Sequence, residues 1–150
     1  MRLLPFVAAL FLGFVGPAMA QSFDTPEAML SALYSPYLSH EVPENDEIFR
    51  SHALNALYEA DTEASGGEVG AIEFDPVING QDWTITEFAL GKIKVNGDTA
   101  IARVTFKNFD AANTLDFTLV NEDGWKYDNI VASGGDYEYS LVDIFKDYEY

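Results

Sequence analysis

Proton transfer is the chemistry that the side chains of this sequence could perform. Its two histidines, His40 and His52, are the side chains whose ordinary pKa lies closest to neutral pH. A carboxylate base beside a neutral acid donor in an apolar pocket also suits proton transfer. The residues available for that arrangement are the carboxylates Asp75, Asp82 and Glu87 and the acid donors Tyr34, Tyr37 and His52. Their spacing is not specific for one reaction.

The same residues have a structural interpretation, which we favour. Asp75 precedes a proline, and both Asp75 and Asp82 lie in an irregular stretch, residues 70–83. Aspartates in turns bond nearby backbone amides, and His52 falls on the apolar spacing of a helix. We therefore expect Asp75 and Asp82 to organise turns and His52 to pack. Together with Trp83 they are the candidate pocket or loop residues.

Metal binding has little support in the sequence. His40 and His52 are 12 residues apart, and the chain has no cysteine. Residues 121–124, Asn-Glu-Asp-Gly, lack the alternating oxygen ligands of a calcium loop and have the composition of a hairpin turn. The sequence therefore predicts neither a metal site nor a cofactor.

Composition and charge restrict the class of protein and of partner. The 150 residues include 25 Asp or Glu and 8 Lys or Arg, with a net charge of -17, and 48% of the residues are hydrophobic. That hydrophobic content excludes a disordered acidic chain and provides a core for one domain. The negative charge repels phosphate backbones and disfavours nucleic acid. The expected partner is a cationic protein or a small-molecule ligand.

The N-terminal residues have the pattern of a secretory signal peptide. Arg2 precedes an apolar run over residues 3–15, and the small-residue pattern Ala18-Met19-Ala20 follows. The run is shorter than the roughly 20 residues that span a bilayer. Gln21 stands where a lipoprotein would have cysteine. We expect cleavage after Ala20, with a periplasmic or secreted product and no stable membrane anchor.

Two segments have the apolar spacing of amphipathic helices. The first has Pro26 as its first residue and either Asp24 or Thr25 as its cap. Pro36 lies late in that pattern and should end or bend the helix. The second helix is expected over residues 48–60 and stops near a Gly-Gly pair.

A short helix is expected at the end of the chain. Ser140 and Asp143, three residues further on, have the spacing of a capping box. The residues that recur at helical spacing after it, and that should face inward, are Leu141, Ile144, Phe145 and Tyr148.

Four segments have the composition of strands, and turn sequences separate them. They are residues 84–95, 99–109, 114–121 and 125–132. Alternation predicts that Phe117 and Trp125 are buried, and a change of phase near Gly91 predicts a bulge. The sequence therefore predicts an α+β fold, with helices packed on one face of a curved four-stranded antiparallel sheet. Residues 21–150 form its single domain.

Four segments of the sequence together resemble a known family. They are residues 74–83 (Phe-Asp-Pro-Val-Ile-Asn-Gly-Gln-Asp-Trp), the turn at 96–98, residues 118–130 (Thr-Leu-Val-Asn-Glu-Asp-Gly-Trp-Lys-Tyr-Asp-Asn-Ile) and Ser140-Leu141. The chain is similar here to the bacterial exported family catalogued as domain of unknown function 3828. That family is similar in plan to the cystatin-like cone fold of nuclear transport factor 2. The resemblance implies the fold and export, and it leaves the function open.

The tail repeats the sequence Asp-Tyr-Glu-Tyr at residues 136–139 and 147–150. Tyrosines beside carboxylates suit an interface with a cationic protein. Tyrosines also cover cores, which is the interpretation we favour. The four tyrosines of this candidate interface are Tyr137, Tyr139, Tyr148 and Tyr150.

Three classes of function fit these observations. The leading hypothesis is a non-catalytic, exported, acidic binding module. The alternatives are a cone-fold acid–base enzyme of the isomerase, dehydratase or hydrolase kind, and an inhibitor or immunity protein against a cationic cell-wall-active enzyme. An open cone with inward ionisable groups would favour the enzyme, and a filled cone would favour surface binding.

Overall fold

The structure is a computed structural model that describes residues 21–149 and contains one antiparallel sheet. Its strands are β1 (Ile85–Leu90), β2 (Lys94–Asn96), β3 (Thr99–Asn108), β4 (Ala111–Asn121), β5 (Trp125–Gly134) and β6 (Tyr139–Ser140). They pair in the order β1-β3-β4-β5-β6, and β2 pairs with the same strand as β1. The expected signal peptide and Tyr150 lie outside the described residues.

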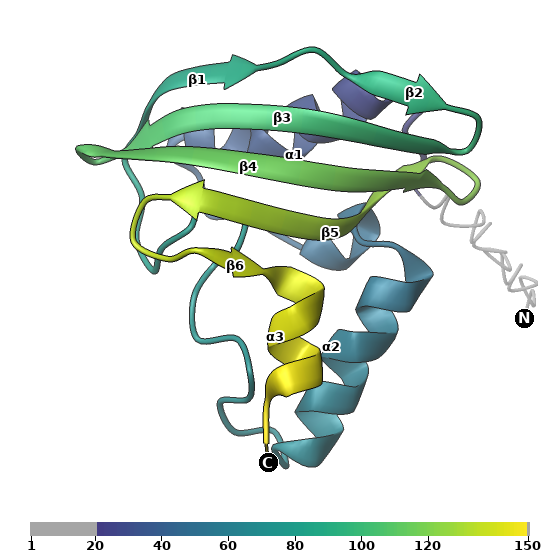
Figure 1. The fold of residues 1–150 in the computed structure, drawn as a ribbon, viewed down its shortest axis with the longest axis vertical. Coiled ribbons are helices and arrows are strands. Elements are labelled where there is room, and N and C mark those ends of the chain that lie inside the picture. The colour runs from purple at the N-terminus through teal and green to yellow at the C-terminus, as the bar shows by residue number, and fades with distance from the viewer. Residues whose placement is uncertain (1–20, 150) are drawn as a thin grey trace, which may run out of the picture.

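The helices lie in two places relative to the sheet. They are α1 (Pro26–Ser39), the 3₁₀ helix η1 (Asp46–Phe49), α2 (His52–Ala64) and α3 (Leu141–Asp147). Figure 1 shows α1 behind the sheet, whereas α2 and α3 lie side by side beyond the β6 edge. The expectation that helices pack on one face therefore holds for α1, while α2 and α3 extend past the sheet.

The sheet has six strands where four were expected, for two reasons. The expected first strand is interrupted at Gly91, whose N–H donates to the Arg103 carbonyl over 2.7 Å. A Cβ on Gly91 would lie 2.9 Å from that carbonyl oxygen, so the close approach requires glycine. The sixth strand, β6, pairs Tyr139 with Ala132 and adds an edge after β5.

The pairing with β3 contains two extra residues, one of them where the sequence predicts a bulge. The register between β1 and β3 shifts between Thr86 and Ala89, and Glu87 has a φ of 51°. The alternation changes there, so Thr86 is exposed and Phe88 faces the core. Beyond Leu90, the four steps from Leu90 to Lys94 lie opposite only three steps from Val104 to Ile101. The extra residue predicted near Gly91 is therefore confirmed, and the one at Glu87 was not predicted.

The alternation predicted for the two central strands is confirmed. The inward residues are Ala100, Ala102, Val104 and Phe106 on β3 and Leu115, Phe117 and Leu119 on β4, and all are buried. Trp125, at the start of β5, is also buried. A period of two with one apolar face is enough to fix the phase of such strands.

Helix α1 begins as predicted and ends later than Pro36. The Thr25 side chain accepts a hydrogen bond from the Ala28 N–H and caps the helix. Pro36 lies inside the last turn, and the helix closes at His40, which is left-handed with a φ of 59°. Because Pro36 removes only one late N–H, it does not terminate α1.

Helix α2 begins later than predicted. The Ser51 N–H donates to the Tyr127 carbonyl over 2.8 Å, and Arg50 forms a bridge to the same strand residue. These contacts hold residues 50–51 extended and separate η1 from α2. Ser51 then caps α2 by accepting from the Leu54 N–H at 3.0 Å.

The predicted capping box at α3 is wrong. The Ser140 side chain makes no capping bond. Instead, Asn129 on β5 accepts a hydrogen bond from the Val142 N–H at 3.0 Å, and its amide donates to Ser140 Oγ at 3.2 Å. A side chain of the sheet therefore caps α3, because the pairing of β5 with β6 brings Asn129 beside the first helical turn.

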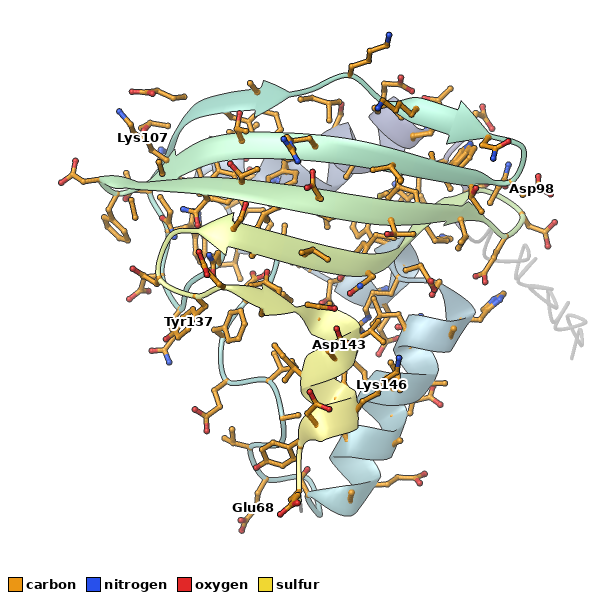
Figure 2. The ribbon with its side chains drawn as sticks, viewed as in Figure 1. Glu68, Asp98, Lys107, Tyr137, Asp143 and Lys146 are labelled. Carbon is orange, nitrogen blue, oxygen red and sulfur yellow. The ribbon has the colours of Figure 1, made fainter. Side chains whose placement is uncertain are left out.

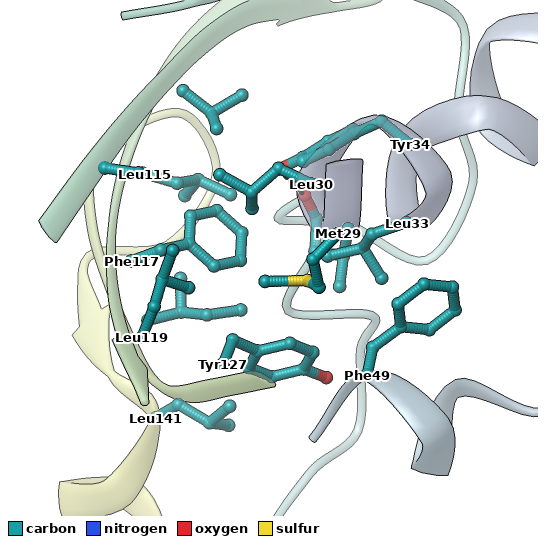
Figure 3. Packing of buried hydrophobic residues seen from close by; sticks show 14 of the residues in the cluster. Met29, Leu30, Leu33, Tyr34, Phe49, Leu115, Phe117, Leu119, Tyr127 and Leu141 are labelled. Carbon is teal, nitrogen blue, oxygen red and sulfur yellow. Dashed lines mark hydrogen bonds between the residues drawn. The ribbon is translucent and has the colours of Figure 1, made fainter. Parts of the chain in front are cut away.

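Side chains fill the space between α1 and the sheet. Figure 3 shows Met29 and Leu30 of α1 opposite Phe117 and Leu119 of β4. These four side chains are fully buried, as is Tyr34, whose ring lies 6.2 Å from Phe117 in an edge-to-face arrangement. The inner face of the sheet is therefore a packed core.

Candidate functional site

Between α2 and β1 the chain runs through residues 65–84 without a helix or strand; we call this segment the connector. Tyrosines from two distant parts of the chain hold its centre. The Tyr34 hydroxyl donates to the Val77 carbonyl at 2.8 Å, and the Tyr139 hydroxyl donates to the Pro76 carbonyl. The connector is thus fixed by hydrogen bonds to side chains outside it.

Asp75 is the carboxylate at the middle of the connector. Its Oδ1 accepts from the Val77 N–H at 2.9 Å, and its Oδ2 accepts from the Tyr37 hydroxyl at 2.5 Å. The backbone of Asp75 also pairs with Gly80. The expectation that Asp75 organises a turn is therefore confirmed, and one of the predicted acid donors, Tyr37, is its neighbour.

Burial changes the proton affinity of this pair. The loss of water around Asp75 raises the pKa of its carboxyl, and the hydrogen bonds from Tyr37 and Val77 oppose that rise only in part. Burial and the Asp75 carboxylate also raise the pKa of Tyr37, which therefore stays a hydrogen-bond donor. The Trp83 ring packs edge-to-face on Tyr37, with ring centroids 5.6 Å apart.

A groove of about 710 Å³ opens beside Asp75; we call it the connector groove. Its lining residues are Asp46, Tyr58, Val69, Ile72, Glu73, Phe74, Asp75, Pro76 and Gln81. Between the lining residues Val69 and Ile72, the Ala71 N–H donates to the Asp61 carboxylate at 2.8 Å, and a Cβ on Gly70 would lie 2.3 Å from that carboxylate. Glycine thus allows the connector to pass close to the Asp61 side chain of α2.

A second groove of about 520 Å³ runs along α2; we call it the α2 groove. It is lined by Glu47, Arg50, Asn55, Tyr58, Glu59, Thr62 and Glu63. Tyr58 lines both grooves. Both contain carboxylates and aromatic or apolar surface, a combination that suits a cation with an apolar stem.

Arg50 and Tyr58 form the wall between the grooves. The Arg50 guanidinium carbon lies 3.9 Å from the centre of the Tyr58 ring, and its Nη1 contacts Asp46 Oδ2 at 3.2 Å. Arg50 Nε also donates to Asn55 at 2.7 Å. Burial raises the pKa of Tyr58 to about 12, although Arg50 acts in the opposite direction.

The other predicted pocket residues lie elsewhere. His52 does not pack: its side chain is 87% exposed, and its Nδ1 contacts Glu122 at 3.2 Å. That prediction is wrong because α2 starts at His52, which places the side chain at a solvated helix end. Asp82 is exposed, and its carbonyl accepts a hydrogen bond from Asn108. The structure thus brings Asp75 and Trp83 together around Tyr37, without His52 or Asp82.

The tail tyrosines have different environments. Tyr139 is partly buried, as expected for a tyrosine that covers the core, and its hydroxyl bonds the connector. Tyr137 is 45% exposed and stacks on Phe74 with centroids 4.7 Å apart. Tyr148 is 41% exposed, so the expectation that it faces inward is wrong, because α3 ends at Asp147. Tyr150 lies outside the described residues. Figure 2 shows Tyr137 beside the start of β6.

Of the residues that line the two grooves, only Asp75 was a predicted site residue, and three of the others contact one another at the boundary. They are Asp46, Arg50 and Tyr58. Asp46 and Arg50 have the i, i+4 spacing of an ion pair, and Tyr58 lies four residues after the buried Leu54, so both signals are present in the sequence. What the sequence lacks is any mark that these residues face the connector.

Comparisons with known proteins add no relatives: no protein-family model, curated protein or solved structure matches this chain. Among residues 21–149, no three His, Cys, Asp or Glu side chains are grouped so that they could hold a metal ion. No helix in the same described range is long and apolar enough to cross a membrane.

Proposed function

We propose that this chain is an exported, non-catalytic, acidic binding module that holds a cationic ligand in the connector groove. The observation that carries the proposal is the packed inner face of the sheet, where Tyr34 and Phe117 are fully buried. A filled interior leaves no room there for a substrate, whereas the connector groove is open beside it. Export is proposed from the signal-peptide pattern of residues 1–20.

The charge of the groove supports a cationic ligand. Asp46, Glu73 and Asp75 contribute carboxyl groups to its lining, while Ile72 and Phe74 contribute apolar surface. The whole chain carries a net charge of -17, which also attracts cations at longer range. A lysine or arginine side chain, with an aliphatic stem and a charged end, fits such a lining.

An acid–base enzyme is the second candidate function. The observation in its favour is the raised pKa of Asp75 beside the Tyr37 hydroxyl, at the wall of a groove. Against it, both carboxylate oxygens of Asp75 already accept hydrogen bonds from the protein, and the Tyr34 hydroxyl is bonded to the Val77 carbonyl. These bonds support a structural role for the pair.

Two further proposals, the family membership and the inhibitor or immunity function, come from the sequence. We propose membership of the domain of unknown function 3828 family and a cystatin-like cone, supported by the α+β architecture with a curved antiparallel sheet. An inhibitor or immunity protein would use the same acidic surface against a cationic enzyme. It differs from the lead only in the identity of its ligand.

The test is a titration of the ¹⁵N-labelled purified protein with an acetylated hexalysine peptide at low salt. Saturable chemical-shift changes are expected at the backbone amides of Val69, Ile72 and Phe74. Glu73→Gln should weaken binding, and the effect should decline with salt as the screening length falls to about 8 Å at physiological ionic strength. Asp98→Asn is the control, since Asp98 lies at the β2–β3 turn, far from the connector (Figure 2).

Two results would contradict the proposal. Shifts spread over the outer face of the sheet, for example at Ile101, would indicate nonspecific attraction to the acidic surface. An equal loss of affinity in Glu73→Gln and Asp98→Asn would show that net charge, rather than the connector groove, attracts the peptide.

A further inference from the structure

We propose that the connector groove and the α2 groove together form one binding site for an extended basic segment of a protein partner, with Tyr58 at the junction. The inference rests on the proposed function, because it names the ligand class for the same acidic site.

The two grooves meet at a small set of residues. Tyr58 lines both of them. Asp46 lines the connector groove, and the next residue, Glu47, lines the α2 groove. Arg50 bonds Asp46 and lies over the Tyr58 ring, so one cluster of contacts forms the boundary between the grooves. A ligand that crosses this boundary lies in both.

The size of the two grooves favours a polypeptide over a single amine. Their volumes are about 710 and 520 Å³, and each is within the range of a pocket for one drug-sized molecule. One ammonium group on a short chain would occupy a small part of that space. An extended peptide advances about 3.3 Å per residue and places alternate side chains on the same side, so several residues could occupy both grooves.

Each groove carries its own negative charge. The connector groove has Asp46, Glu73 and Asp75. The α2 groove has Glu47, Glu59 and Glu63 beside Arg50, whose charge already contacts Asp46. Carboxylates therefore remain in excess on both sides of Tyr58, and a ligand with basic groups on both sides meets opposite charge at each.

A buried hydroxyl responds to the charges of both grooves although it lines neither of them. The Tyr127 hydroxyl is buried and has no hydrogen-bond partner among the described residues. Figure 3 shows it at the end of a ring that points away from the sheet. The groups that act on it electrostatically are Tyr58, Arg50, Asp46 and Asp75, all of which line the grooves.

The experiment compares three probes at low salt by calorimetry on the purified protein: acetyl-lysine-methylamide, spermidine and acetylated hexalysine. Hexalysine is expected to bind most tightly and to shift amides along both grooves in the NMR titration. Glu73→Gln in one groove and Glu63→Gln in the other should each weaken hexalysine binding by about two- to fivefold. Asp98→Asn should leave the affinity unchanged.

Specific outcomes separate this inference from the proposed function. If Glu63→Gln has no effect while Glu73→Gln weakens binding, the ligand uses the connector groove alone and the two-groove site is wrong. If spermidine binds as tightly as hexalysine, the ligand is a small polyamine, and the proposal of a polypeptide ligand is wrong. If none of the probes shifts the groove amides, the proposed function fails, and this inference fails with it.

Discussion

The Tyr37 hydroxyl donates a hydrogen bond of 2.5 Å to Oδ2 of Asp75, which joins the last turn of α1 to the centre of the connector. The bond crosses 38 positions of the sequence. It places a buried carboxylate at the wall of the connector groove and fixes the direction in which the connector leaves Gly80. The stability of the groove therefore depends on the ionisation of one side chain.

The first prediction concerns Asp75→Asn and pH. Because burial raises the pKa of Asp75 in the folded protein, the native state holds this proton more tightly than the unfolded chain, whose aspartate pKa is about 3.9. The contribution of Asp75 to stability is full below that unfolded value and is lost as pH rises through the folded pKa. Asparagine does not titrate, so the variant should gain stability relative to the native protein as pH rises from about 4.

Urea denaturation of both proteins at several pH values between about 3.5 and 7 measures this difference. Tyr37→Phe provides a second comparison. It removes a hydrogen bond that lowers the pKa of Asp75, so it should move the titration to higher pH and cost about 1 kcal/mol. If the native protein instead gains stability relative to Asp75→Asn as pH rises, folding lowers the pKa of Asp75 and the prediction is wrong.

The second prediction concerns the core. Phe117 is fully buried and packs edge-to-face on Tyr127, with centroids 5.9 Å apart. Phe117→Ala should cost about 3 to 5 kcal/mol in the free energy of unfolding, as large-to-small core substitutions do. Chemical denaturation measures it, and a loss under about 1 kcal/mol would contradict the packed inner face.

The third prediction concerns the cap of α3. Asn129→Ala removes the acceptor for the Val142 N–H and the donor to Ser140 Oγ, so it should cost about 1 to 2 kcal/mol. Ser140→Ala removes only one of these two bonds and should cost less. If thermal unfolding ranks the two variants in the reverse order, Ser140 is the functional cap after all.

The fourth prediction separates two neighbouring tyrosines. Tyr139→Phe removes the hydroxyl that bonds the Pro76 carbonyl and should cost about 1 kcal/mol. Tyr137→Phe keeps the ring that stacks on Phe74 and should change stability by less than about 0.5 kcal/mol. Equal stability of the two variants in urea would argue against the connector bond of Tyr139.

The fifth prediction concerns export. The pattern Ala18-Met19-Ala20 predicts cleavage before Gln21 and release of the domain from the membrane. Intact-mass measurement on the exported protein should therefore give the mass of residues 21–150. A product that keeps residues 1–20 would rule out the signal peptide.

The elements that the sequence predicts well are those with a local cause. Thr25 begins α1 because its side chain reaches the Ala28 N–H three residues away. Strands β3 and β4 keep one phase over their whole length, so Phe106 and Phe117 are assigned to the core by alternation alone. These patterns need no knowledge of the rest of the fold.

The features that the sequence does not predict depend on distant partners. The apolar spacing around Phe49 continues into α2, and only the bond from Ser51 to the Tyr127 carbonyl shows where the helix must start. Asn129 caps α3 across 13 positions, at a spacing that no helix motif contains. At the site, Asp75 was among the candidates, but its pairing with Tyr37 follows from the packing of α1 under the connector.

The three bonds on residues 75–77 also bear on how the chain folds. Tyr34 and Tyr37 come from the first helix and Tyr139 from the last strand, so the middle of the chain is held from both ends. Removal of either terminal part would therefore break bonds at the centre of the connector. We therefore expect the domain to unfold in one cooperative step, and to refold slowly for its size because contacts of such high sequence separation must form together.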